Sequence, residues 1–228
     1  MKTLFLSALM ATSTFAGTAL TAFAEEGDNP WMIRGRVIGV LPDAGADLSV
    51  AGAALPGTVD INDQYVPELD ITYFFSENIA AELILGVTPH DVDATNVTVT
   101  GVLDDATVPI GDVWLLPPTL TLQYHFDTGS AFKPYVGAGV NATFFFNEDA
   151  GETADGIDYD PSFGLALQAG FDYDLDGVPG GWAFNADVKK IWIEPDVTVD
   201  FTSALGATVD AEVEINPLVV GLGLGYKF

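Results

Sequence analysis

The amino-acid sequence predicts an all-β fold, an eight-stranded antiparallel up-and-down transmembrane β-barrel. Three observations lead to this prediction. Apolar residues alternate with small or polar residues along short stretches, which is the pattern of strands with one apolar face. Mean hydropathy is positive, +0.31, although the chain holds 33 acidic residues. The connections between the stretches alternate in length, as they do in barrels of an outer membrane.

The N-terminal segment has the order of a secretory signal peptide. Lys2 precedes a mostly apolar stretch, and Ala22-Phe23-Ala24 then stands before two glutamates. We expect residues 1–24 to be the signal peptide and residues 25–228 to form the outer-membrane β-barrel. A membrane anchor is the alternative, but it needs about 20 consecutive apolar residues. Serine, threonine and glycine interrupt this segment from Thr12 onward.

Eight stretches with strand character follow the signal peptide. The second and third are joined by three residues and the fourth and fifth by five, whereas the four longest connections have about 14 to 23 residues. Short turns on one side and long connections on the other indicate an up-and-down barrel. The stretches are Trp31–Val40, Gln64–Phe75, Ile79–His90, Trp114–Phe126, Phe132–Phe146, Pro161–Asp174, Trp182–Ile193 and Val213–Phe228.

One face of the even-numbered stretches is apolar and becomes aromatic near the short turns. In the second stretch this face reads Leu69, Ile71, Tyr73 and Phe75. Aromatic residues at that level are typical of the interfacial girdle on a lipid-facing surface. The last stretch, which ends in "GLGLGYKF", repeats the pattern. We expect it to close the barrel, because an open strand edge in lipid leaves backbone groups unpaired.

If every second residue is counted back from Phe228, three polar residues of the last stretch fall on the lipid-facing side. They are Glu212, Glu214 and Asn216. Lipid would not accept them. Either they lie above the bilayer, or a bulge at Pro217 exchanges the two faces.

Charge and composition exclude several function classes. The formal net charge is −26, which repels nucleic acid. The chain has no cysteine, so neither disulfides nor a cysteine zinc site can support it. The segments 41–63, 91–112, 147–160 and 194–214 hold 21 of the 33 acidic residues and no lysine or arginine. They predict acidic extracellular loops.

Four segments together resemble the OmpW family of small eight-stranded outer-membrane barrels: "PELDITYFFSENIAAELILGVTPH", "LPPTLTLQYHF", "KPYVGAGVNATFFF" and "GLGLGYKF". The resemblance covers most of residues 31–228. It implies a bacterial outer-membrane location and a narrow, largely hydrophobic interior that passes small apolar molecules. The C-terminal aromatic also resembles the signal read by the barrel assembly machinery.

The residues on the inner faces of the predicted strands divide the lumen into two halves, one charged and one apolar. We interpret the half near the short turns as a structural network of ion pairs, with a gate as the alternative, because unpaired charges inside a narrow barrel are costly. This charged set is Arg34, Arg36, Glu68, Asp70, Glu82, Asp187 and Lys189.

The other half of the lumen is apolar. Its side chains either pack as a simple core or form a concave pocket at the barrel mouth, and a pocket of that kind suits a small apolar ligand. This apolar set is Ile38, Val40, Ile84, Phe145, Ile191 and Ile193.

Other chemistry has little support. Asp172–Gly177 begins like a calcium loop, but Ala183 stands where the loop needs a bidentate glutamate. His90, His125 and Ser162 could suggest a hydrolase, but no spacing places a carboxylate behind either histidine. We therefore expect no enzymatic activity, no metal and no cofactor.

The sequence thus predicts passive passage or binding of small hydrophobic molecules. The alternative is a structural or surface-interaction protein with a plugged lumen and acidic loops. The expected partners are outer-membrane lipid, small hydrophobic solutes and the barrel assembly machinery, and nucleic acid is not among them.

Overall fold

The computed structural model describes residues 29–99, 101, 103–175 and 180–228. The expected signal peptide, residues 1–24, lies outside the described residues. Eight strands form a closed antiparallel barrel, as predicted, and the pairing of β10 with β12 completes the wall. In chain order the strands are β1 (Trp31–Leu41), β5 (Gln64–Phe74), β6 (Ile79–Gly86), β9 (Thr119–His125), β10 (Phe132–Ala150), β12 (Ser162–Asp174), β13 (Gly181–Ile191) and β16 (Leu218–Lys227).

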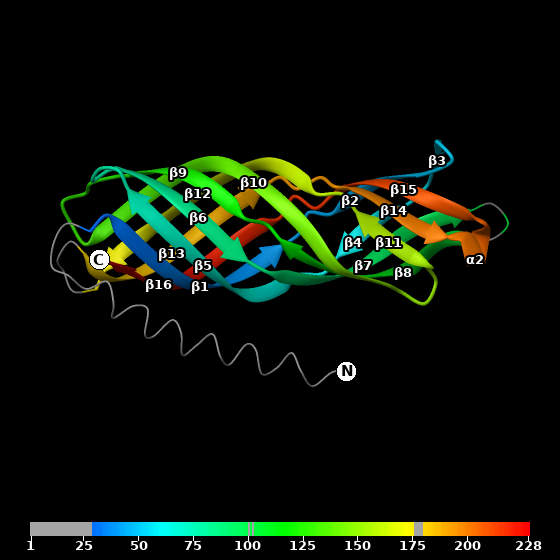
Figure 1. The fold of residues 1–228 in the computed structure, drawn as a ribbon, viewed down its shortest axis with the longest axis horizontal. Helices are drawn as coiled ribbons and strands as arrows, with labels where there is room; N and C mark the ends of the chain where they lie inside the picture. Colours follow the sequence, from blue (N-terminus) through cyan, green and yellow to red (C-terminus); the bar gives the residue numbers. More distant parts are fainter. Residues whose placement is uncertain (1–28, 100, 102, 176–179) are drawn as a thin grey trace, which may run out of the picture.

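The segments expected to be long loops are largely strands, and they prolong the barrel beyond the end opposite the C-terminus (Figure 1). Their apolar residues alternate with acidic ones or threonine, so one face is buried and the other is exposed. We call this part the extension. It consists of the end of β10, the helix α2 (Thr202–Leu205) and the strands β2 (Gly45–Val50), β3 (Ala53–Leu55), β4 (Thr58–Ile61), β7 (Thr88–Val99), β8 (Leu103–Leu116), β11 (Gly156–Tyr159), β14 (Asp196–Phe201) and β15 (Ala207–Glu214).

Two predicted strands are interrupted where the barrel meets the extension. The stretch Ile79–His90 divides at Val87 into β6 and β7, and the stretch Trp114–Phe126 divides at Pro117-Pro118 into β8 and β9. Neither proline has an N–H group to give to a ladder. The pairing of β6 with β9 therefore ends at Ile84 and Thr119, and the pairing of β7 with β8 begins at Thr88 and Leu115.

The last predicted strand also divides, into β15 and β16. Asn216, between them, has a φ of +36°, which regular strands do not adopt. Buried and exposed residues nevertheless continue to alternate across the interruption, so Pro217 does not exchange the faces. Glu212 and Glu214 are exposed on the extension, which is the first of the two outcomes expected for them.

Apolar side chains cover the outside of the eight-stranded part. Leu222 and Leu224 of β16 are about half exposed, as are Leu120 and Leu122 of β9. Aromatic rings in edge-to-face contact lie at the end where the short turns are, for example Trp182, Tyr226 and Phe228. This is the surface of a barrel that sits in lipid. Among the described residues, no helix is long and apolar enough to cross a membrane.

Candidate functional site

Strand register brings opposite charges together inside the barrel. Arg34 of β1 is the cross-strand neighbour of Asp70 on β5, and Arg36 is the neighbour of Glu68. All four side chains belong to the buried face of their strands. A cation and a carboxylate on neighbouring strands reach each other with little loss of side-chain freedom.

Arg36 contacts carboxylates from two sides of the barrel. Its guanidinium lies 2.7 Å from Glu68, 2.6 Å from Asp70 and 2.5 Å from Asp187. Nη2 contacts Glu68 and Nε contacts Asp70 as ion pairs without hydrogen-bond geometry, whereas Nη1 contacts Asp187 and also donates to Asn185 Oδ1 at 3.2 Å. Arg36 therefore ties β1 to β5 and to β13.

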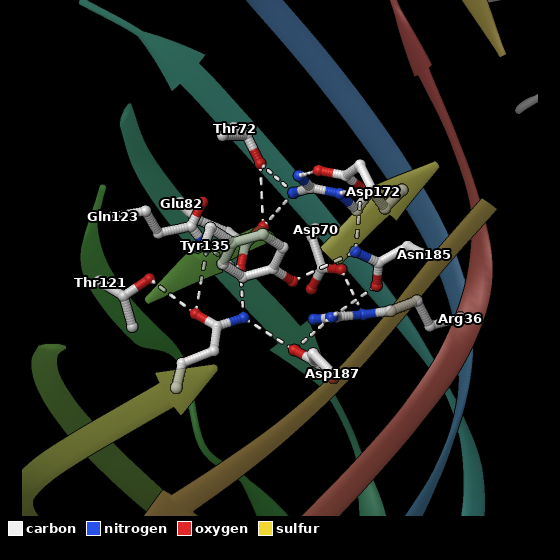
Figure 2. A network of polar contacts seen from close by, with 12 residues as sticks. Arg36, Asp70, Thr72, Glu82, Thr121, Gln123, Tyr135, Asp172, Asn185 and Asp187 are labelled. Atoms are coloured by element: carbon white, nitrogen blue, oxygen red, sulfur yellow. Dashed lines mark hydrogen bonds and ion pairs between the residues drawn. The ribbon is translucent and has the colours of Figure 1, made fainter. Parts of the chain in front are cut away.

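Arg34 forms the second centre of the network, and Figure 2 labels its partners Thr72, Glu82 and Asp172. It pairs with Glu82 of β6, and its Nε and Nη2 donate to the two Asp172 oxygens at 3.0 and 2.6 Å. The guanidinium also lies 5.6 Å from the centre of the Tyr135 ring. Arg34 is fully buried, so these partners replace its hydration.

Gln168 connects the two centres, Lys189 adds a cation to the Arg36 centre, and Gln123 supports Glu82 and Gln168. Lys189 Nζ lies 2.7 Å from Glu68 and 3.4 Å from Asp187. Gln168 donates to Glu82 at 2.9 Å and to Asp187 at 2.7 Å, and Gln123 donates to Glu82 at 2.8 Å. The resulting cluster, which we call the floor network, consists of Arg34, Arg36, Glu68, Asp70, Glu82, Gln123, Gln168, Asp172, Asn185, Asp187 and Lys189.

The inward glycines of β16 make room for the floor network. A Cβ on Gly223 would lie 2.6 Å from Arg36 Cγ, and one on Gly221 would lie 2.7 Å from an Asp187 oxygen. A Cβ on Gly225 would lie 2.9 Å from Arg34 Cγ. The terminal alternation of glycine with leucine thus has two causes. The leucines face lipid, and the glycines leave volume for arginine.

The seven charged residues singled out from the sequence all lie in this network. Sequence reasoning missed Asp172 as a member of the network, because it considered this residue only as the start of a calcium loop. The alternation along β12 could have identified Asp172. Gln168 and Asp172 lie on its inner face, whereas Leu167 and Tyr173 lie on its outer face.

Five of the six apolar residues singled out from the sequence lie on strands of the floor network or directly after one, whereas Phe145 is on β10. Ile38, Val40, Ile191 and Ile193 are part of the hydrophobic core, and Phe145 packs against it. Ile84, two residues beyond Glu82 on β6, is also buried.

An apolar cavity of about 250 Å³ lies beyond these residues, inside the extension. None of the six lines it. Its walls come from both sheets of the extension, and valine, isoleucine and leucine predominate. Sequence reasoning missed this cavity because it took the extension for loops. The lining includes Val59, Ile61, Val92, Val97, Ile110, Val113, Leu115, Val197, Val199, Val209 and Val213.

His90 and Tyr159 also line the cavity. Burial is the largest cause of the shifts at both residues, lowering the pKa of His90 and raising the pKa of Tyr159. Both groups are therefore neutral near neutral pH. Tyr159 stacks on Phe145, with the ring centres 5.0 Å apart.

The residues considered for a hydrolase make separate contacts. His90 Nδ1 lies 2.9 Å from the Asn62 carbonyl oxygen, and His125 Nε2 lies 2.9 Å from Gln123 Oε1. The Ser162 hydroxyl accepts from the Glu194 N–H at 2.9 Å. The arrangement lacks the base and nucleophile in contact that covalent catalysis requires.

Comparison with known proteins gives a consistent result. The model of the OmpW family matches residues 25–228. The uncharacterized outer-membrane protein y4mB of Sinorhizobium fredii is 44% identical over 89% of this chain and 81% of its own. The dibenzothiophene metabolism operon protein DoxH of Pseudomonas sp. strain C18 is 29% identical over 92% of this chain and 93% of its own. The crystal structure of the outer membrane protein OprG from Pseudomonas aeruginosa superposes with a TM-score of 0.77 at 33% identity, covering 87% of this chain and 95% of that one.

Proposed function

Because the chain belongs to the OmpW family of bacterial outer-membrane barrels, whose members are not enzymes, we propose that it binds or passively passes small hydrophobic molecules. The observation that carries this proposal is the apolar cavity of about 250 Å³ in the extension. An apolar cavity of about 150 Å³ already stays dry and takes up benzene. A space larger than this one-ring cavity suits a guest of two fused rings or a short alkyl chain.

The relatives support the same class of guest. DoxH carries the name of an operon for the metabolism of dibenzothiophene, which is a small apolar molecule of three fused rings. For this chain we propose the chemical class and not that compound.

The floor network separates the cavity from the far end of the barrel. Its charged groups fill the interior below the core residues Ile38 and Ile191, and an apolar molecule would displace many ion pairs there. Exit through the wall is easier, since the ladder is interrupted at Val87 and Pro117-Pro118. A groove on the outer wall beside Pro118, lined by Leu83 and Leu120, would receive the molecule on the lipid side.

The test is uptake of a labelled apolar solute into liposomes that enclose a trap for it, with and without the protein. Ile84→Asp places a charge where the β6–β9 ladder ends beside the exit, and Ile191→Asp places one in the apolar core, so we expect each to lower the uptake rate while the barrel still folds. Thr208→Asp is the matched control. Thr208 is exposed on the outside of β15, so this substitution adds the same charge away from the cavity. Uptake that is no faster with the unmodified protein or with either variant than in protein-free liposomes would favour the alternative, a structural protein with a plugged lumen.

Two further expectations belong to this proposal. Residues 1–24 are a signal peptide that is removed on export. The β16 strand, with leucines on one face and glycines on the other, is the segment that the barrel assembly machinery binds.

A further inference from the structure

The apolar cavity contains one hydrogen-bond acceptor whose place is fixed by the fold. His90 is 2% exposed and is one of the residues that line the cavity. Its Nδ1 lies 2.9 Å from the backbone oxygen of Asn62. A carbonyl oxygen can only accept, so Nδ1 carries the proton. In the neutral ring, Nε2 then has a free lone pair.

The contact that sets this tautomer is itself held in place. The Asn62 side chain accepts from the Asp91 N–H at 2.9 Å and donates to the Asp91 carboxylate at 2.6 Å. These two bonds fix the Asn62 backbone next to β7, and its carbonyl therefore faces the imidazole. Burial lowers the pKa of His90, and the nearby charges of Asp91 and Asp63 offset this only in part, so the ring stays neutral near neutral pH.

Among the described residues, no group hydrogen-bonds to His90 Nε2. The lone pair of Nε2 is therefore left for a guest in the cavity. The other polar groups of the lining are Thr153, whose hydroxyl donates to Pro109 O at 2.9 Å, and Tyr159. The Tyr159 hydroxyl can donate to a guest, but only His90 offers an acceptor that cannot also donate.

We propose that His90 Nε2 accepts a hydrogen bond from a hydroxyl of the guest, so that the cavity prefers an apolar alcohol or phenol to the hydrocarbon of the same shape. This inference rests on the proposed function and narrows it. A guest hydroxyl that donates to Nε2 gives both groups a hydrogen-bond partner, whereas a hydrocarbon leaves Nε2 without one.

The experiment compares three probes of nearly equal size: naphthalene, 2-naphthol and 2-methoxynaphthalene. Binding is measured by equilibrium dialysis of the protein in lipid nanodiscs, with empty nanodiscs subtracted. We expect 2-naphthol to bind about fivefold more tightly than the other two, from the usual net worth of one hydrogen bond. The methyl ether is decisive, because it can accept from Tyr159 but cannot donate to His90.

In His90→Leu we expect the three probes to bind equally and naphthalene to bind as in the unmodified protein. His90→Leu also loses the hydrogen bond to Asn62. A second measurement therefore tests the role of His90 in the unmodified protein. The chain has only two histidines, so ¹⁵N-histidine labelling gives a simple spectrum. We expect 2-naphthol, and not naphthalene, to shift the Nε2 resonance of one of them, and His90→Leu identifies it.

Equal binding of all three probes to the unmodified protein, or a preference for 2-naphthol that survives in His90→Leu, would overturn the role of His90 while leaving the proposed function in place. Binding of none of the probes would overturn both.

Discussion

The Arg36 guanidinium on β1 reaches across β16 to Asp187 on β13, with Nη1 and Oδ2 2.5 Å apart. Gly223 and Gly221 are the residues of β16 that pair with Arg36 and Asp187, respectively. Because these glycines have no side chains, the ion pair can pass over the strand between its partners. A barrel whose interior is filled in this way depends on the glycines as much as on the charges.

Gly223→Ala should therefore destabilise the barrel. The added Cβ would lie 2.2 Å from the Gly35 backbone oxygen and 2.6 Å from Arg36 Cγ. Overpacking of this kind costs about 1–3 kcal/mol. The measurement is urea unfolding in lipid vesicles, with Gly35→Ala as the control, since a Cβ on Gly35 meets nothing within 4 Å. Equal stability of the two variants would show that β16 has room for a methyl group.

Arg36→Met should cost about 3–5 kcal/mol, because it leaves buried carboxylates without their cation. Lys133→Met removes a cation from the partly exposed pair with Asp127 and should cost at most about 1 kcal/mol. Both variants are compared by the same unfolding assay. A small loss in Arg36→Met would mean that water or a bound cation already screens Glu68, Asp70 and Asp187.

The floor network holds more negative than positive charge, and this gives a further prediction. Its cations are Arg34, Arg36 and Lys189, against five carboxylates. Asp70→Asn removes one surplus negative charge and keeps the shape of the side chain, so it should cost clearly less than Arg36→Met. The comparison is made on unfolding midpoints at neutral pH, and a loss in Asp70→Asn equal to that in Arg36→Met would refute the charge count.

Two aspartates should give opposite dependences of stability on pH. On the extension, a hydrogen bond to Asp91, burial and the charges of Asp91 and Asp149 raise the pKa of Asp112. The folded protein then holds this proton more tightly than the unfolded chain, so Asp112 adds stability as pH falls toward about 4 and loses it as pH rises. At the turn, hydrogen bonds from Gly129 and Lys133 lower the pKa of Asp127, which stabilises above about pH 4 and loses its effect below.

The check is the unfolding free energy of Asp112→Asn and Asp127→Asn, each relative to the unmodified protein, between about pH 2 and pH 7. As pH rises, the unfolding free energy of Asp112→Asn should increase relative to that of the unmodified protein. That of Asp127→Asn should decrease relative to the unmodified protein. Parallel pH profiles for the two variants would contradict this.

Much of the eight-stranded part could be predicted because one physical rule governs it. In lipid every second residue must be apolar, so the parity that places Leu222 and Leu224 outside also places Gly221 and Gly223 inside. The same rule put Arg34 and Arg36 in the lumen. The charges on the inward faces of nearby strands also indicated Glu68 and Asp70 as partners of Arg36, and the structure confirms both. The pattern did not indicate Asp187 as a partner, because β13 is far from β1 in the chain.

The extension was missed for a different reason. Its strands expose acidic residues such as Asp196 and Glu212, and such residues are common in loops. The alternation of Val197, Val199 and Phe201 with polar residues was the available signal, and it lay in segments assigned to loops. The interruptions at Pro117-Pro118 and Asn216 depend on local backbone geometry that the hydrophobic pattern does not record.

The central claim, that an apolar molecule occupies the extension, is tested most directly by magnetisation transfer from naphthalene to methyl groups of the protein in nanodiscs. Ala94→Phe, which should fill part of the cavity because Ala94 lines it, serves as the control variant. We predict transfer to methyl groups of Val97, Ile110 and Val199, all of which line the cavity, and its loss in Ala94→Phe. Transfer only to lipid-facing Leu222 and Leu224, unchanged in Ala94→Phe, would contradict the account.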